Sequence, residues 1–274
     1  IETLLAERNQ ILPFEPPDHR RLYGSNGAPT IGAIAACNFS GSRRISVGAA
    51  RDSLIGVRFV NGAGEAIKSG GRVMKNVTGL DLVKLSAGAH GTLGALTEVT
   101  FKLLPRPETS ATLVLDGLDD ARAITALSQA LGSPFEVSGA AHLPAGVGDD
   151  RARTLLRIEN FAASVAYRVD ELRKLLGGGV VLDETASRAL WREVSECAFF
   201  AAPDQRAIWR ISTAPSRAPD LVRLVQRTGA VAHFYDWGGG LVWLAVEATS
   251  DARAKDVRAA VAVTGGHATL VRAP

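Results

Sequence analysis

Alternating apolar and polar residues predict short strands in the first third of the chain. Ile55, Val57 and Phe59 alternate with smaller or charged residues, and the turn residues NGAG follow them. A second short strand is expected around Glu65–Lys68. Two apolar runs separated by a Gly/Asn turn are the usual signature of a β-hairpin.

The same third also predicts two short helices and one further strand. Residues 2–10 have apolar spacing suited to a helix that the following prolines end. Asp81 precedes a short helical pattern as a candidate N-cap, and Val99, Phe101 and Leu103 alternate as in a strand. The stretch GAPTIGAIAACNFSG shows no period, and PRPE at 105–108 predicts a domain boundary.

From residue 109 onward the pattern is a repeat of element order. Strand, helix, strand, strand, helix and strand follow one another up to about residue 184, and a helical link leads through residues 186–197. The same order then returns up to residue 272. Two successive β-α-β-β-α-β units are typical of ferredoxin-like folds, so we expect one antiparallel sheet, or two merged sheets, with helices on one face.

Composition excludes several classes of protein. The 274 residues carry 31 basic and 28 acidic side chains, spread without a dense run of one sign, so no nucleic-acid partner is expected. Cys37 and Cys197 have no paired spacing, so we expect neither a disulfide framework nor a zinc site, and we expect a reducing cytoplasm. No apolar run is long enough for a transmembrane segment.

Residues 70–99 contain six glycines, and two explanations for them stay open. The P-loop pattern GxxxxGK[ST] and the dinucleotide pattern GxGxxG at a strand-to-helix junction are both absent. The glycines therefore either form turns or let a ligand contact backbone amides without a fixed motif.

Other candidate residues have a structural and a functional explanation. The five histidines lack metal-ligand spacing, and no Ser, Cys or His has a nucleophile arrangement, so we predict no metal site and no catalytic residue. Arg43, Arg44 and Arg51 could neutralise a diphosphate or could form a solvated face. Trp237 could pack in a core or contact a partner protein.

These segments resemble the PCMH-type FAD-binding proteins, the vanillyl-alcohol oxidase superfamily. The matching pieces are TIGAIAACNFSG, VGAARD with its hairpin, and GGRVMKNVTGLDLVKLSAGAHGTLGALTEVTFKLLP. The motifs KNVTGLDL and GTLGALTEV most resemble the FAD-binding subunits of bacterial glycolate oxidases, and so do the later segments DWGGGLVWL and GGHATLVRAP. The resemblance implies an α+β protein: residues 1–107 form the second half of a PCMH-type FAD-binding domain, and residues 108–274 form a cap of two ferredoxin-like units.

The resemblance also implies which residues contact FAD. The cofactor-binding residues carried over are Thr30, Gly32, Ala33, Asn38, Gly41, Gly48, Asp52, Asn76, Thr78, Gly79, Asp81, Gly91, Thr92, Gly94, Leu96 and Thr97. Small residues let backbone amides approach phosphates and ring edges, and short polar side chains add hydrogen bonds.

Three features of the family have no counterpart in this sequence. These are a leading subdomain whose Gly-rich loop grips the pyrophosphate, a C-terminal tail that returns to the FAD domain, and the HxGDGN-like cap segment of the catalytic dehydrogenases. We therefore expect a chain truncated at both ends, with FAD occupancy depending on the missing segments. We also expect an accessory role rather than the site of substrate oxidation itself.

The function implied by the resemblance is that of an FAD-dependent oxidoreductase subunit in a glycolate oxidase complex. Its expected partners are a flavin dehydrogenase subunit, an iron–sulfur subunit and a small 2-hydroxy acid substrate. The complex would place the chain peripherally on the inner membrane. Two alternatives stay open: a stand-alone FAD-dependent dehydrogenase of D-lactate type, and an interaction module without cofactor, which an exposed apolar patch around Phe234–Trp243 would favour.

Overall fold

The computed structural model divides the chain into two compact units and describes residues 1–71, 79–201 and 205–273. Unit 1 comprises Ile1–Arg20 and Asn26–Arg106. Unit 2 comprises Arg21–Ser25 and Pro107–Pro274. The short segment Arg21–Ser25 therefore belongs with residues more than eighty positions later in the chain. None of the helices in the described ranges is long and apolar enough to cross a membrane.

Unit 1 is built around a three-stranded antiparallel sheet in the order β3-β2-β4. The expected hairpin is present. Asn61 Oδ1 accepts hydrogen bonds from the amides of Ala63 and Glu65, and these bonds stabilise its turn. The strands and helices of unit 1 are α1 (Glu2–Ala6), β1 (Gln10–Ile11), α3 (Ile31–Cys37), α4 (Arg44–Val47), α5 (Ala50–Ser53), β2 (Leu54–Val60), β3 (Ala66–Gly70), α6 (Leu82–Ser86), β4 (Ala95–Phe101) and β5 (Leu104–Pro105). Helix α2 (Arg20–Tyr23) begins at the junction with unit 2.

Helix α3 was not expected from the sequence, because its small residues show no apolar period. Thr30 begins the helix as its N-cap, accepting a hydrogen bond from the Ala33 amide, and Asn38 ends it in the left-handed conformation. Ile34 and Ala35 are the buried side chains of α3 and pack in two different apolar clusters. The helix is therefore stabilised by its caps and by tertiary packing rather than by an amphipathic pattern.

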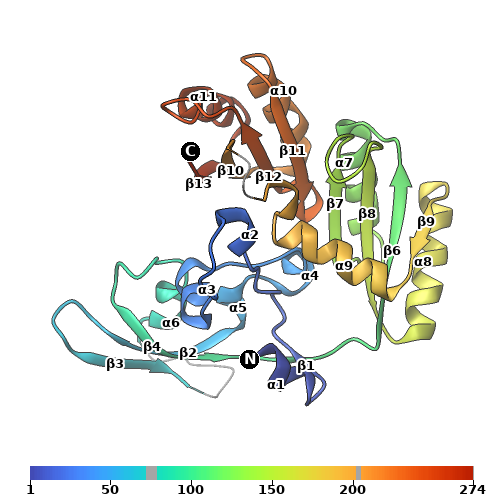
Figure 1. Ribbon diagram of the computed structural model, residues 1–274. Helices are drawn as coiled ribbons and strands as arrows, with labels where there is room; N and C mark the ends of the chain where they lie inside the picture. The colour runs from blue at the N-terminus through green and yellow to red at the C-terminus, as the bar shows by residue number, and fades with distance from the viewer. Residues whose placement is uncertain (72–78, 202–204, 274) are drawn as a thin grey trace. The chain divides into compact units, whose positions relative to one another are not determined.

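Unit 2 is a fused pair of ferredoxin-like repeats (Figure 1). Repeat A consists of β6 (Thr109–Asp116), α7 (Asp120–Leu131), β7 (Gly139–Leu143), β8 (Arg153–Asn160), α8 (Ala162–Leu176) and β9 (Val180–Leu182). Repeat B consists of β10 (Ala207–Ser212), α10 (Ala218–Gln226), β11 (Val231–Asp236), β12 (Leu241–Val246), α11 (Ala254–Thr264) and β13 (His267–Arg272). All eight strands form one antiparallel sheet in the order β13-β10-β12-β11-β7-β8-β6-β9. Each half has the strand order 4-1-3-2 in its own numbering, so the predicted α+β fold class is confirmed.

Helices cover both faces of this sheet, which differs from the expectation of one face. Because side chains alternate along a strand, Thr112 and Leu113 of β6 point to opposite faces. Thr112 accepts a hydrogen bond from the Trp191 indole of α9 (Glu184–Ser195), whereas Leu113 faces the side of α8. A large apolar cluster containing Trp191, Phe234 and Trp243 lies on the α9 face of the sheet. Helix α9, which links the two repeats, covers this face because its own apolar side chains require burial. Three short 3-10 turns, η1 (Ala198–Phe200), η2 (Pro215–Arg217) and η3 (Trp237–Gly239), complete the unit.

Candidate functional site

Three segments of unit 1 enclose a wide, open hollow of about 680 Å³. The first is the start of α3, the second is the turn after β2, and the third is the glycine-rich segment before β4. The amides of Gly88 and His90 donate hydrogen bonds to the carbonyls of Ala35 and Ala36, at 3.3 and 2.9 Å. These two bonds hold the glycine-rich segment alongside α3.

Seven of the predicted cofactor residues line this hollow, although they come from two parts of the sequence. They are Thr30, Gly32, Ala33, Gly91, Thr92, Gly94 and Leu96. The sequence analysis missed the other lining residues, which are Ala36, Val60, Asn61, Gly62, Leu93 and Ala95. The turn residues 60–62 had already been assigned to the hairpin, and nothing in their local pattern indicated that the turn folds towards α3.

The remaining predicted residues are placed elsewhere in unit 1, and most have structural contacts. The Asn38 amide oxygen accepts from the Arg51 amide at 2.8 Å, and the buried Gly41 amide donates to Phe14 and Glu15 carbonyls. Asp52 accepts from the Ala49 amide at 2.7 Å, beside Gly48. Thr97 donates to the Arg58 carbonyl, Gly79 is exposed, and Asp81 caps α6. Asn76 and Thr78 lie outside the described residues.

The glycines of the hollow fall into two kinds. A Cβ added at Gly94 would lie 2.4 Å from the Val60 carbonyl oxygen, so Gly94 is required by the close approach of two backbone segments. Gly32 is different, because a Cβ added there would meet nothing within 4 Å and the residue lies in a regular helix. The fold itself therefore has no need for glycine at position 32.

The described residues that line the hollow include no ionisable side chain. The Thr30 and Thr92 hydroxyls are occupied by the Ala33 amide and the Ala89 carbonyl. The hollow therefore offers small apolar side chains and backbone to a ligand. Its volume is within the range of about 300–1,000 Å³ that is usual for cofactor pockets.

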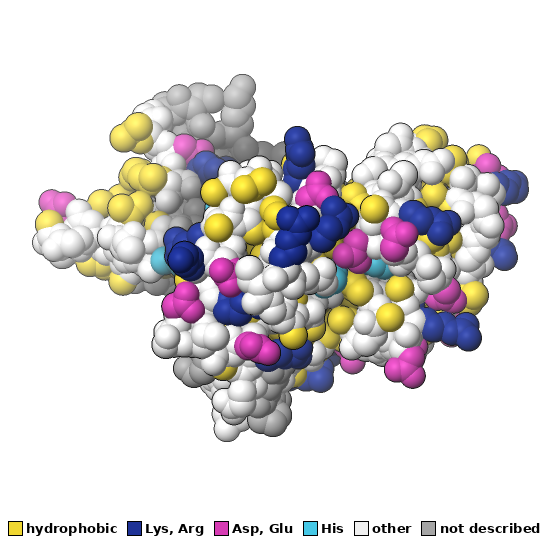
Figure 2. Space-filling model, turned by 90° about the horizontal axis from the view of Figure 1, so that it is seen from above, with side chains coloured by type: hydrophobic (Ala, Val, Ile, Leu, Met, Phe, Trp, Pro, Cys, Tyr) yellow, Lys and Arg dark blue, Asp and Glu magenta, His cyan; other side chains and the backbone are white. Residues whose placement is uncertain are grey.

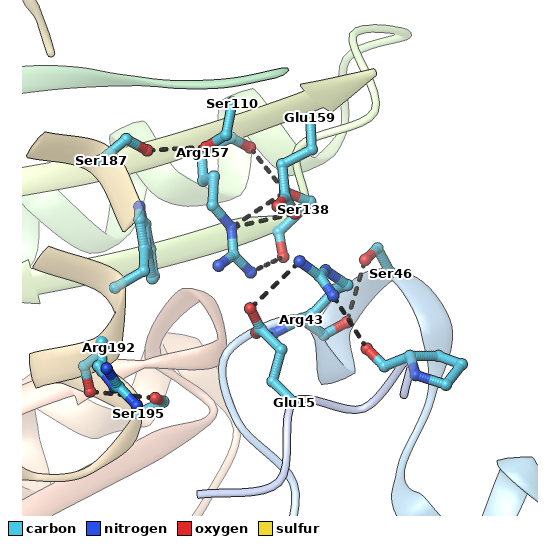
Figure 3. A network of polar contacts seen from close by, with 12 residues as sticks. Glu15, Arg43, Ser46, Ser110, Ser138, Arg157, Glu159, Ser187, Arg192 and Ser195 are labelled. Atoms are coloured by element: carbon cyan, nitrogen blue, oxygen red, sulfur yellow. Dashed lines mark hydrogen bonds and ion pairs between the residues drawn. The ribbon is translucent and has the colours of Figure 1, made fainter. Parts of the chain in front are cut away.

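The arginines considered for a diphosphate do not line the hollow. Arg43 forms an ion pair with Glu15 at 3.3 Å, and its amide donates to the same carboxylate at 2.7 Å (Figure 3). Burial lowers the pKa of Arg44, which the nearby charge of Asp52 partly opposes. Arg51 is exposed. The described structure therefore gives Arg43 a local structural contact within unit 1.

Asp81 has a capping role that can be separated from any cofactor contact. Its carboxylate accepts a hydrogen bond from the Lys84 amide at 3.0 Å. We expect Asp81→Ala to destabilise α6 by about 1 kcal/mol, and Asp81→Ser to recover most of this loss because serine is also a good N-cap. Hydrogen exchange of the amides in Leu82–Ser86 measures the effect. A loss of flavin affinity in Asp81→Ser at unchanged α6 protection would instead indicate direct contact with the cofactor.

Unit 2 contains two buried polar clusters that the sequence analysis missed. In one, Arg157 lies 3.3 Å from the Glu159 carboxylate, donates to Ser138 and stacks over the Trp191 ring (Figure 3). In the other, Asp120 accepts hydrogen bonds from His233 and Tyr235. The members of each cluster come from different strands and helices, so no local pattern could have joined them. No group of three or more His, Cys, Asp or Glu within the described ranges could hold a metal ion.

The aromatic residues of repeat B are mostly core residues. Phe234 is fully buried and Trp243 is 3% exposed. These two residues therefore do not form the exposed apolar patch that would have favoured an interaction module without cofactor. Trp237 is half-buried, packs against the same cluster and lies under the Arg210 guanidinium at 5.0 Å. On the face shown in Figure 2, basic and acidic side chains are interspersed.

No family model matches the sequence. The chain is 35% identical over 271 residues to the glycolate oxidase subunit GlcE of Escherichia coli (strain K12), which covers 98% of the chain and 67% of GlcE. It is 42% identical over 101 residues to the glycolate oxidase subunit GlcD of Bacillus subtilis (strain 168), covering 37% of the chain and 21% of GlcD.

A solved structure of alkyldihydroxyacetonephosphate synthase has the same fold, with a TM-score of 0.71 at 14% identity. The match covers 97% of this chain and 57% of the synthase, so the chain spans just over half of that structure. At this identity the likeness describes the fold alone.

Proposed function

The chain belongs to the family of the glycolate oxidase subunit GlcE, and from this premise we propose that it is the FAD-binding subunit of a glycolate oxidase complex. FAD supplies the chemistry that oxidises the CH–OH group of a 2-hydroxy acid. The residues of this chain supply binding and position. The proposed partners are a flavin dehydrogenase subunit and an iron–sulfur subunit, in a complex on the cytoplasmic side of the inner membrane.

The observation that carries this proposal is the hollow of unit 1. Thr30, Gly32 and Ala33 at the start of α3 meet Gly91, Thr92, Gly94 and Leu96 there, although some sixty residues separate the two groups. Gly32, a helix residue with open space beside its Cα, independently supports a ligand at this position. Glycine in a helix costs up to about 1 kcal/mol relative to alanine, and the fold gains nothing from it here. We infer that the cofactor approaches the backbone of α3 at this point.

The Gly32→Ala variant tests this inference with two opposite effects. We expect it to stabilise unit 1 by about 0.5–1 kcal/mol, because alanine is the better helix former. We expect the same variant to weaken FAD binding about tenfold or more, because the added methyl group occupies space needed by the ligand. The bulkier Gly32→Val variant should weaken binding further.

The measurement is flavin absorbance and FAD titration on the chain and on a protein extended to the length of GlcE. Gly71→Ala is the matched control, since a Cβ there also meets no atom of the described residues within 4 Å but the residue does not line the hollow. If neither wild-type form bound FAD, the cofactor proposal would fail. If Gly32→Ala bound FAD as well as wild type did, the hollow would not be the site.

A turnover assay distinguishes the proposed complex subunit from a stand-alone dehydrogenase. We expect the extended protein alone to bind FAD without reducing a dye in the presence of glycolate or D-lactate, and to become active only with its partner subunits. Unaided turnover would favour a stand-alone 2-hydroxyacid dehydrogenase.

A further inference from the structure

The two repeats of unit 2 meet along a short seam between β7 and β11. These are the second strands of repeats A and B, and they are antiparallel neighbours in the fused sheet. A single register pair, Tyr235 opposite His142, joins them. Within repeat A the central strands β6 and β8 pair over eight positions, and within repeat B the strands β11 and β12 pair over six. The backbone ladder is therefore thinnest where the two repeats meet.

A buried polar cluster lies at this seam, on the face covered by α7. Asp120, the first residue of α7, accepts hydrogen bonds from the Tyr235 hydroxyl at 2.7 Å and from His233 Nε2 at 2.8 Å. His142 Nε2 lies 3.4 Å from the other carboxylate oxygen, and His142 Nδ1 is 2.9 Å from the Thr154 hydroxyl. The carboxylate thus belongs to repeat A, whereas its two hydrogen-bond donors belong to repeat B.

Burial makes the cluster a structural feature rather than a site for substrate. His142 and Tyr235 are fully buried, and the His233 side chain is 8% exposed. Burial alone would raise the pKa of Asp120. The imidazoles of His142 and His233 and the Tyr235 hydroxyl outweigh burial, so the pKa is held well below its usual range. The Asp120 side chain itself is 27% exposed, and such a half-buried carboxylate would still be costly to leave without its partners.

Apolar contacts also join the repeats, but they lie further along α7. A Cβ added at Gly239 or Gly238 would lie 2.6 Å from Ile124 or 2.5 Å from Leu131, so the turn after β11 packs closely on the middle and end of the helix. Such contacts are non-directional. Hydrogen bonds to a carboxylate have defined directions and lengths, so they are suited to fixing which residues of two strands face each other.

We propose that Asp120 is the joint between the two repeats, and that its hydrogen bonds from His233 and Tyr235 hold β7 and β11 in register where the backbone ladder is short. Without this carboxylate the seam opens locally, while the ladders inside each repeat stay closed.

Hydrogen exchange of the full chain with Asp120→Asn tests the proposal. We expect the amides of β7 and β11 to lose protection about 30- to 100-fold, with much smaller changes at the β6–β8 and β10–β12 ladders. Tyr235→Phe removes one donor and keeps the ring, so it should give the same pattern with a smaller loss. Asp119→Asn is the matched control: Asp119 is the N-cap of the same helix, and its effect should be confined to α7.

Three results would overturn the proposal: unchanged protection at the seam, an equal loss over all of unit 2, or a loss in Asp120→Asn restricted to α7. The second result would mean that Asp120 contributes only to global stability. The third would mean that it acts only on its own helix.

The dependence on pH gives a second readout. Because the folded pKa of Asp120 is depressed, its contribution is present above the unfolded value of about 4 and is lost as pH falls below it. The seam of the wild type, corrected for intrinsic exchange rates, should therefore open more easily below about pH 4, and that of Asp120→Asn should change less. The other ionisable groups facing the cluster are His142, His233 and Tyr235, with Arg223 of α10 near Tyr235 and paired to Asp220. A wild-type seam as insensitive to acid as that of the variant would contradict the proposal.

Discussion

Gly94→Ala should destabilise unit 1 by about 3 kcal/mol and abolish FAD binding. The added Cβ would lie 2.4 Å from the Val60 carbonyl oxygen and 2.9 Å from Phe59 Cδ2, and the φ of +149° is one that L side chains rarely adopt. The obstructing atom is backbone of β2, the central strand, so it cannot rotate away. Overpacking combined with a strained backbone costs a few kcal/mol.

Two variants on the same hollow serve as controls for Gly94→Ala. At Gly91 the φ is +76° but a Cβ meets nothing within 4 Å, so Gly91→Ala should cost about 1 kcal/mol from backbone strain alone. At Gly62 there is neither a positive φ nor a close neighbour, so Gly62→Ala should leave stability nearly unchanged. Equal destabilisation by all three variants would show that the close approach of Gly94 to Val60 is not the cause.

Measuring unit 1 separately requires a probe other than tryptophan. All four tryptophans lie at or beyond position 191, in unit 2. Tryptophan fluorescence therefore reports the unfolding of unit 2, and hydrogen exchange of Leu54–Val60 reports unit 1. We expect Gly94→Ala to change the second signal and not the first.

Arg272→Ala should destabilise unit 2 by about 3 kcal/mol. The Arg272 guanidinium donates hydrogen bonds to three backbone carbonyls, those of Leu22 at 2.6 Å, Phe200 at 2.9 Å and Arg206 at 3.1 Å. Leu22 is fully buried in the apolar cluster of unit 2, so its carbonyl has little access to water once the arginine is removed. Hydrogen bonds from charged donors contribute about 1.5–3 kcal/mol each, and they are not additive.

Urea unfolding followed by tryptophan fluorescence measures the loss in Arg272→Ala. Arg272→Lys should recover only part of the stability, because one ammonium group cannot reproduce the planar fork that reaches three acceptors. Arg223→Ala is the surface control: Arg223 is 60% exposed and pairs with Asp220 on its own helix, so its removal should cost less than about 0.5 kcal/mol. If Arg272→Ala were as mild as this control, the three-carbonyl contact would contribute little to the fold.

Local residue patterns were enough to predict the hairpin of unit 1 and the element order of unit 2. Turn residues such as Asn61 stabilise the hairpin through hydrogen bonds to the next few amides, so a short stretch of sequence is enough to predict the turn. The repeated order of strands and helices after residue 108 predicted the ferredoxin-like units, because a βαββαβ sequence has few ways to form one sheet. The motif wording around residues 70–99 indicated the family.

Contacts between residues far apart in the sequence could not be predicted from such patterns. Asp120 and Tyr235 are 115 positions apart, and Arg272 and Leu22 are 250 apart. No periodicity links such pairs, because their contact depends on how strands are ordered in the sheet and on where distant segments pack. The same reason applies to the glycines. Gly94 is required by a neighbouring backbone segment, whereas Gly32 faces open space. The sequence cannot distinguish these two kinds of glycine, because the difference depends on the surrounding atoms.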